Sequence, residues 1–169
     1  MLPQALSLRE AIQGMVNEMV KVFIVYDTKY GNTKLVAETI AEGMNEAEGI
    51  ETTTGDVEET DPEQTVRFDA ILIGSPNHFG GPVGGINRFI DKLGKLELKA
   101  KWAAVFDTYE GKDYEKAVKK MEKRIGEKIP ALKLITAGLS IKVDGTKGPI
   151  TDGELPKCKE FGKKIANLL

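Results

Sequence analysis

Residues 28–33, Thr-Lys-Tyr-Gly-Asn-Thr, combine small polar side chains and a glycine in a pattern suited to holding a phosphate. They follow an apolar stretch, residues 21–26, and precede a segment with helical spacing. The start of a helix offers unpaired backbone N–H groups and the positive end of the helix dipole, and both favour an anion. An ordinary helix cap made by Asn or Thr would use the same residue types. The sequence contains neither the G-x-x-x-x-G-K-[ST] pattern of nucleoside triphosphate sites nor the G-x-G-x-x-G pattern of dinucleotide sites.

Two further loops follow apolar stretches and carry more candidate residues. Residues 74–82 read Gly-Ser-Pro-Asn-His-Phe-Gly-Gly-Pro, which is too rich in Gly and Pro for regular structure. Residues 106–114 read Phe-Asp-Thr-Tyr-Glu-Gly-Lys-Asp-Tyr. In open parallel sheets, ligands bind beyond the carboxyl ends of the strands, where the winding direction switches. We therefore expect the three loops to line one site.

Short apolar stretches alternate with helical periodicity along the chain. Strands are predicted at residues 21–26, 50–54, 69–74 and 102–106, and within residues 132–143. The last of these is expected to be interrupted near Gly138. The alternation predicts an α/β domain with a three-layer, doubly wound, five-stranded parallel sheet of order 2-1-3-4-5. Trp102 and Tyr114 are predicted to be buried in its core.

Residues 1–19 lie outside this alternation and form an N-terminal extension, with residues 20–169 as the domain. Helical spacing is followed by Leu8, Ile12, Met15 and Met19. A candidate capping box is formed by Ser7 and Glu10. One interpretation is an extra amphipathic helix that packs onto the domain. The other is a dispensable extension, with one of the later methionines as the natural start.

The composition excludes several classes of function. A net charge of -2 gives no basic footprint for nucleic acid. One cysteine and one histidine exclude an internal disulfide framework and argue against a His/Cys metal site. No apolar run approaches the roughly 20 residues that span a bilayer, so no membrane partner is expected. We expect a cytoplasmic protein in which Cys158 is a buried structural thiol.

Charge is unevenly distributed along the chain. Residues 46–63 contain eight acidic residues and no basic ones, whereas residues 112–128 are dominated by lysine. Patches of this kind can dock a charged partner, or they can be two solvated faces of opposite sign.

The three loops together resemble the flavodoxin family. T-x-x-G-N-T after the first strand resembles the flavodoxin FMN-phosphate motif T-x-T-G-N-T, with Tyr30 at the position of a threonine. A bulky residue there is similar to the flavodoxin domains of flavodiiron proteins and to WrbA-type reductases. Residues 74–82 resemble the G-[ST]-P-x-x-x-G segment that wraps the isoalloxazine ring. Residues 107–110 resemble the D-x-x-Y-E segment, one residue shorter. The resemblance extends from Lys21 to the C-terminus.

This resemblance implies a flavodoxin-like fold with an FMN site that needs no catalytic side chain. Tyr109 would stack on the ring, and His78 or Phe79 would take the place of the aromatic residue that flavodoxins often stack there. A glycine peptide in the Gly80–Gly81 segment could flip to present its carbonyl to the flavin. The implied cofactor contacts are Thr28, Lys29, Tyr30, Gly31, Asn32, Thr33, Pro76, Asn77, His78, Phe79, Gly80, Gly81, Asp107, Thr108, Tyr109 and Gly111.

Three functions fit this resemblance. The first is a low-potential electron carrier whose redox partners would be a reductase and an iron–sulfur or flavodiiron-type acceptor. The second is an NAD(P)H-dependent quinone or flavin reductase of WrbA type, which Tyr30 keeps open. The third is a non-redox interaction domain that has lost FMN. The sequence favours the carrier, because no insertion is large enough to build a separate substrate pocket.

Overall fold

The computed structural model describes residues 7–17 and 19–169, with the side chains of residues 14–17 left undescribed. Its centre is a parallel sheet of six strands in the order β2-β1-β3-β4-β5, with β6 also paired to β4. The strands are β1 Val20–Tyr26, β2 Ile50–Asp56, β3 Ala70–Pro76, β4 Trp102–Tyr109, β5 Lys133–Leu134 and β6 Leu139–Lys142. The predicted parallel sheet and its order are confirmed.

The fifth position of the sheet is divided between two short strands, β5 and β6. The chain passes from one to the other close to Gly138, where a side chain would collide with Val118 and crowd Val105. The predicted interruption near Gly138 is therefore confirmed, and α4 Lys116–Lys128 packs closely against the chain there through Val118.

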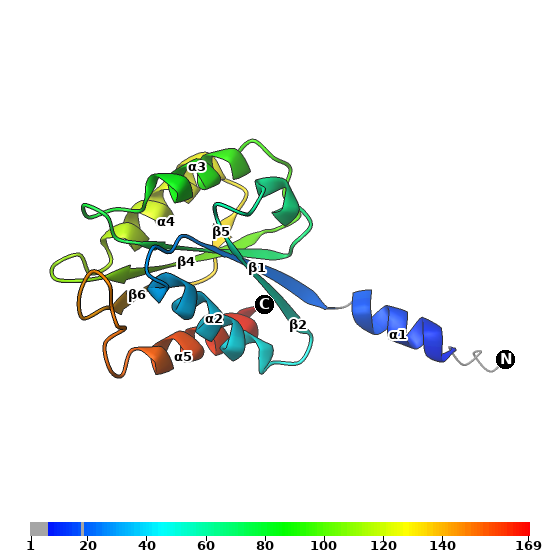
Figure 1. Ribbon diagram of the computed structural model, residues 1–169. Helices are drawn as coiled ribbons and strands as arrows, with labels where there is room; N and C mark the ends of the chain where they lie inside the picture. Colours follow the sequence, from blue (N-terminus) through cyan, green and yellow to red (C-terminus); the bar gives the residue numbers. More distant parts are fainter. Residues whose placement is uncertain (1–6, 18) are drawn as a thin grey trace.

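Helices cover both faces of the sheet, as Figure 1 shows. One face carries α2 Asn32–Asn45 and α5 Leu155–Leu168, and the other carries α3 Gly84–Leu93 and α4. A 3-10 turn, η1 Pro62–Thr65, lies before β3. The predicted three-layer α/β architecture is confirmed.

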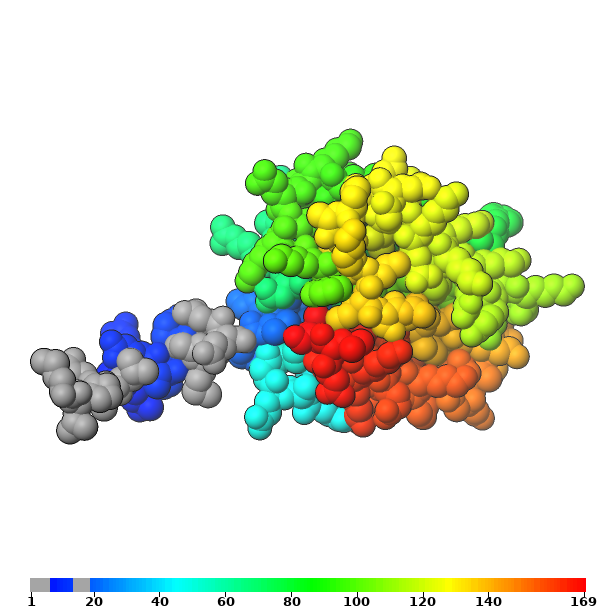
Figure 2. Space-filling view, turned by 180° about the vertical axis from the view of Figure 1, so that it is seen from behind, coloured from blue at the N-terminus to red at the C-terminus, as the bar shows by residue number. Residues whose placement is uncertain are grey.

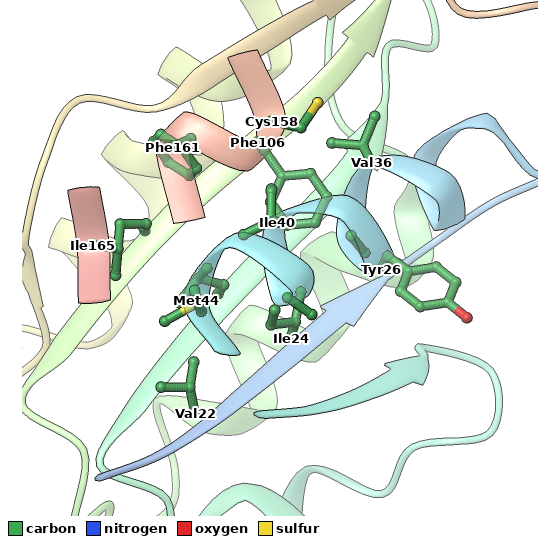
Figure 3. Packing of buried hydrophobic residues seen from close by; sticks show 14 of the residues in the cluster. Val22, Ile24, Tyr26, Val36, Ile40, Met44, Phe106, Cys158, Phe161 and Ile165 are labelled. Carbon is green, nitrogen blue, oxygen red and sulfur yellow. The ribbon is translucent and has the colours of Figure 1, made fainter. Parts of the chain in front are cut away.

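The core is continuous through the sheet because the central strands are apolar on both faces. In β1, residues 22–26 are all buried. On the α2/α5 side, Ile40 and Met44 pack with Phe106 and Ile165 around the strands (Figure 3). The two helices approach so closely that a side chain at Gly162 would collide with the carbonyl of Ile40. Cys158 is buried in this layer, as predicted, and burial raises the pKa of its thiol to about 12.

The N-terminal helix α1 Leu8–Asn17 forms but does not pack on the domain. Its capping box is complete: the Ser7 N–H and Oγ donate to Glu10 Oε2 at 2.9 and 3.0 Å, and the Glu10 N–H donates to Ser7 Oγ at 3.2 Å. The helix extends away from the sheet (Figures 1 and 2), and Leu8 is 78% exposed. The predicted helix is confirmed, but the two large apolar side chains described on it, Leu8 and Ile12, are exposed. The prediction for the Met15 side chain lies outside the described residues.

Two predictions of buried aromatic residues were wrong. Trp102 opens β4 at the amino edge of the sheet and is 43% exposed. Tyr114 precedes α4 and is 58% exposed, because the first buried residue of that helix is Ala117.

Within the described residues, no helix is long and apolar enough to cross a membrane.

Candidate cofactor-binding site

A cavity of about 380 Å³ opens at the carboxyl edge of the sheet, where the loops after β1, β2, β3, β4 and β6 meet. Its size falls within the usual range for a small-molecule or cofactor site. It is lined by Asp27, Thr28, Lys29, Tyr30, Asn32, Thr33, Glu58, Pro76, Asn77, His78, Val83, Thr108, Tyr109, Glu110, Val143 and Thr146. The three predicted loops therefore do meet at one site.

The loop after β1 leads into α2 without an ordinary side-chain cap. Gly31 is the N-cap residue, it adopts φ 90°, and no side chain caps the helix there. Thr28 Oγ1 instead accepts a hydrogen bond from the Gly31 N–H at 3.0 Å, which holds the loop in a tight turn. The Asn/Thr helix-cap explanation of this sequence is thus not supported. The positive end of α2 and its first N–H groups are left available to an anion.

Two contacts join this loop to its neighbours. Thr33 Oγ1 and Thr108 Oγ1 share a buried hydrogen bond at 3.0 Å, which fixes the start of α2 to the end of β4. The Asn32 side chain lies against Gly148, where any side chain would collide with it. Gly148 has φ 92°, so both its backbone conformation and the contact with Asn32 favour glycine.

The loop after β3 is held rigidly by Asn77. Its N–H and Nδ2 both donate to the Thr108 carbonyl, at 2.9 and 3.1 Å, and its Oδ1 accepts from the Ala117 N–H at 2.9 Å. These bonds tie the loop to β4 and to the first turn of α4. Asn77 lines the cavity and also supports its wall.

His78 and Gly81 close a two-residue turn through paired backbone hydrogen bonds of 2.8 and 3.2 Å. The central residues, Phe79 and Gly80, have φ 50° and 72°. Positive φ at both central positions is the mark of a type I′ turn. His78 lines the cavity, whereas Phe79 is 96% exposed and Gly80 and Gly81 lie toward α4.

At the end of β4, which extends to Tyr109 and so includes part of the predicted loop, the residues divide between the cavity and the core. Thr108 and Tyr109 line the cavity. Asp107 is fully buried instead: its carboxylate accepts from Ser140 Oγ and from the Val118 N–H, the latter at 3.0 Å. Burial raises the pKa of Asp107, against the lowering effect of these bonds. Asp107 thus links β4, β6 and α4 and does not reach the ligand space.

Ten of the sixteen predicted residues line the cavity. The six that do not are Gly31, Phe79, Gly80, Gly81, Asp107 and Gly111. Of these, Gly31 shapes loop 28–33 and Asp107 holds β4, β6 and α4 together, whereas the Gly111 backbone turns at φ 60° outside the cavity wall.

Six lining residues were not predicted: Asp27, Glu58, Val83, Glu110, Val143 and Thr146. Glu58 follows β2, and Val143 and Thr146 follow β6. The rule that the carboxyl ends of parallel strands share one edge applies to these loops as well, and it could have found them. Thr146 Oγ1 donates to Glu110 Oε1 at 3.0 Å, which closes the cavity between two loops.

The cavity wall carries charge of both signs. The pKa of Asp27 is raised, chiefly by burial and then by the nearby carboxylates of Asp56 and Glu58. The ammonium groups of Lys29 and Lys147 lie 5.4 and 6.0 Å from the centre of the ring of Tyr30, another lining residue. No group of three or more acidic, His or Cys side chains in the described residues could hold a metal ion.

These features fit an FMN. The open helix start, with Thr28, Asn32 and Thr33, suits its phosphate. Tyr30, His78 and Tyr109 offer aromatic surface, and Val83 and Val143 offer apolar surface, for a flat ring.

A family model described as a flavodoxin domain matches residues 23–142. A curated flavodoxin from Aquifex aeolicus (strain VF5) is 38% identical over 96 residues. That match covers 55% of this chain and 52% of the relative, so it spans about half of the relative's length.

Solved structures share the whole fold. Oxidised Flavodoxin 2 from Bacillus cereus is 25% identical, with a TM-score of 0.75 over 89% of this chain and 100% of that one. A flavodoxin, WrbA-like protein from Agrobacterium tumefaciens is 19% identical, with a TM-score of 0.64 over 88% of this chain and 96% of that one. With the family model covering the loops after β1, β2, β3 and β4 that line the cavity, the chain belongs to the flavodoxin domain family, whose members bind FMN.

Proposed function

We propose that this chain binds one FMN in the cavity and carries electrons between protein partners. The observation that supports this most is the start of α2, which opens without a side-chain cap into a cavity whose other loops carry aromatic side chains. A phosphate and a flat ring need these two environments side by side. FMN would supply the redox chemistry, so no catalytic side chain is required.

Each loop has its own task in this proposal. Thr28, Asn32 and Thr33 hold the phosphate with the backbone N–H groups of the first turn of α2. Tyr30, His78 and Tyr109 flank the ring and exclude water from it. Lys29, Pro76, Asn77 and Thr108 complete the wall.

The carboxylates of Asp27 and Glu58 set the electrical environment of the bound cofactor. Both line the cavity, and the raised pKa of Asp27 reflects partial burial among other acids. Negative charge beside the ring opposes the addition of further negative charge, because like charges repel most strongly in a poorly solvated site. We propose that these groups keep the reduction potential low.

We place this carrier in the cytoplasm, since the single, buried Cys158 suits a reducing compartment. Its partners would be a reductase that delivers electrons and an iron–sulfur or flavodiiron-type protein that accepts them. The reductase alternative requires NADH or NADPH to reach the ring directly.

Purified protein tests both steps. We expect the purified protein to be yellow and to release one FMN per chain on denaturation. Protein that is isolated colourless should take up added FMN to the same stoichiometry. Failure of both would contradict the FMN proposal.

NADH or NADPH added anaerobically to FMN-loaded protein should bleach it slowly without another protein. Rapid bleaching would replace the carrier with the WrbA-type reductase.

A further inference from the structure

Phe79 is the most exposed of the large hydrophobic side chains described, at 96%. It also occupies the first central position of a type I′ turn with φ 50°. A non-glycine residue in the left-handed region costs about 1–2 kcal/mol, and Asn or Gly would occupy this position with less strain. Within the chain, the ring makes an edge contact with His78, with ring centres 4.5 Å apart. The folded domain gains little from Phe79 in return for this strain.

Lysines from α4 lie directly beneath the turn. A side chain built at Gly80 would come within 3.3 Å of Lys116 Cδ, and one built at Gly81 would come within 3.3 Å of Lys120 Cδ and 3.4 Å of its Nζ. Lys116 also pairs with Asp113 at 3.0 Å. Helix α4 as a whole carries six basic and two acidic residues.

A second exposed aromatic residue lies just before Lys116 in the chain and contacts a cavity residue. Tyr114 is 58% exposed, and its ring contacts that of Tyr109, a cavity residue, with centres 5.3 Å apart. We call Phe79, Tyr114, Lys116 and Lys120 the Phe79 surface. It combines exposed aromatic side chains with positive charge at the edge of the cavity.

The acidic side of the cavity lacks this combination. Residues 46–63 carry eight acidic side chains. No large hydrophobic side chain in this segment is exposed. Protein interfaces concentrate their binding energy in aromatic anchors, and charges around the anchor steer the partner. The acidic segment has charge but no exposed aromatic side chain, whereas the Phe79 surface has both.

We propose that the Phe79 surface docks an acidic redox protein, with Phe79 as the apolar anchor and the α4 lysines as the steering charges. The inference rests on the proposed FMN function, because it places the partner beside the cavity to receive or deliver an electron there. One electron passes from the reduced cofactor to one oxidised metal centre of the partner. Docking at this position accounts for the strained and exposed conformation of Phe79.

The test uses one haem protein in two charge forms: cytochrome c, which is basic, and its succinylated derivative, which is acidic. FMN-loaded protein is photoreduced and mixed anaerobically with each ferric form, and haem reduction is followed at increasing ionic strength. We expect the acidic form to react faster at low ionic strength and to slow as salt is added. The net charge of -2 would by itself favour the basic form, so this order can arise only from a local basic surface.

Three variants locate the surface. F79N suits the turn better than Phe and should fold at least as stably, yet it should slow reduction of the acidic form about tenfold. K120E should slow it by a similar factor at low salt. K123E makes the same charge change on α4, but Lys123 is not one of the lysines beneath the turn, and its effect should be clearly smaller.

Each other outcome overturns a stated claim. Faster reaction with the basic form, or an unchanged rate in F79N, would contradict an acidic partner at this surface. Loss of FMN from F79N would show that Phe79 serves the cofactor and would also contradict the docking role. Failure of the wild-type protein to bind FMN is visible in its absorbance before mixing, and it would overturn the proposed function itself.

Discussion

Loop 28–33 lines the cavity and the groups around Asp107 are buried outside it, and the two regions use their polar atoms in opposite ways. Around Asp107, the carboxylate accepts from Ser140 and Val118, and Ser140 Oγ accepts from the Glu115 N–H at 3.0 Å. At loop 28–33, a helix of 14 residues begins without a side-chain cap. Polar groups that satisfy one another hold the frame, whereas groups left open are free to bind a ligand.

The largest expected effect is on the frame. Asp107→Ala leaves the Val118 N–H and the Ser140 hydroxyl buried without their acceptor, which should lower the free energy of unfolding by about 3 kcal/mol. The affinity of the remaining folded protein for FMN should change little, because Asp107 does not line the cavity. Urea unfolding of the apoprotein checks the first expectation, and FMN titration checks the second.

Asp91→Ala provides the matched control for this prediction. Asp91 is a surface carboxylate paired with Arg124 at 2.6 Å, and its loss should cost much less stability, because solvent screens exposed ion pairs. Equal destabilisation by the two variants would contradict a special structural role for Asp107.

Gly31→Ala should affect both the frame and the open loop. The residue adopts φ 90°, so alanine introduces strain of about 1–2 kcal/mol although no neighbouring atom obstructs the new methyl group. FMN affinity should fall as well, because the strained turn presents the first N–H groups of α2. In Gly126→Ala, where the glycine lies inside α4 with open space around it, stability should instead rise by about 0.5–1 kcal/mol. Thermal unfolding of the two variants together measures the contrast.

Thr28→Ala should weaken binding more than it weakens the fold. A lost hydrogen bond to a charged phosphate corresponds to about a tenfold loss of affinity, whereas the turn loses one solvent-exposed contact with Gly31. Thr39→Ala is the control: Thr39 lies within α2, and its hydroxyl donates to the Leu35 carbonyl, away from the cavity. Fluorescence titration of FMN should separate the two variants, and equal affinities would remove Thr28 from the proposed site.

The smallest effect concerns pH. The folded pKa of Asp27 is raised, mainly by burial, so the folded state binds more protons than the unfolded state between the normal carboxyl pKa of about 3.9 and the raised value. The contribution of Asp27 to stability therefore falls as pH rises through this window. The stability of Asp27→Asn relative to the wild type should therefore increase as pH rises through this window. Above the window, the difference in stability should be constant. A stability advantage of the variant that shrinks as pH rises would contradict this prediction.

The sequence predicts most of this architecture because its apolar stretches determine the strands, and their alternation with helices determines the winding. The loop at Thr28 can be predicted because small polar residues and a glycine, placed between a strand and a helix, suit a phosphate. Phe79 was misplaced at the cavity because the direction of a loop side chain depends on turn geometry, and the type I′ conformation directs this ring outward. Asp107 belongs to the same motif as residues that line the cavity. Because side chains alternate between the two faces of β4, its carboxylate points into the core.

The central claim is that the open start of α2 binds a phosphate attached to a flavin. Titration of the apoprotein with FMN and with riboflavin, which differ by that phosphate, tests the claim directly. We predict that FMN binds at least about a hundredfold more tightly, since several charge-assisted hydrogen bonds are lost with riboflavin. Equal affinities for the two flavins would contradict the account.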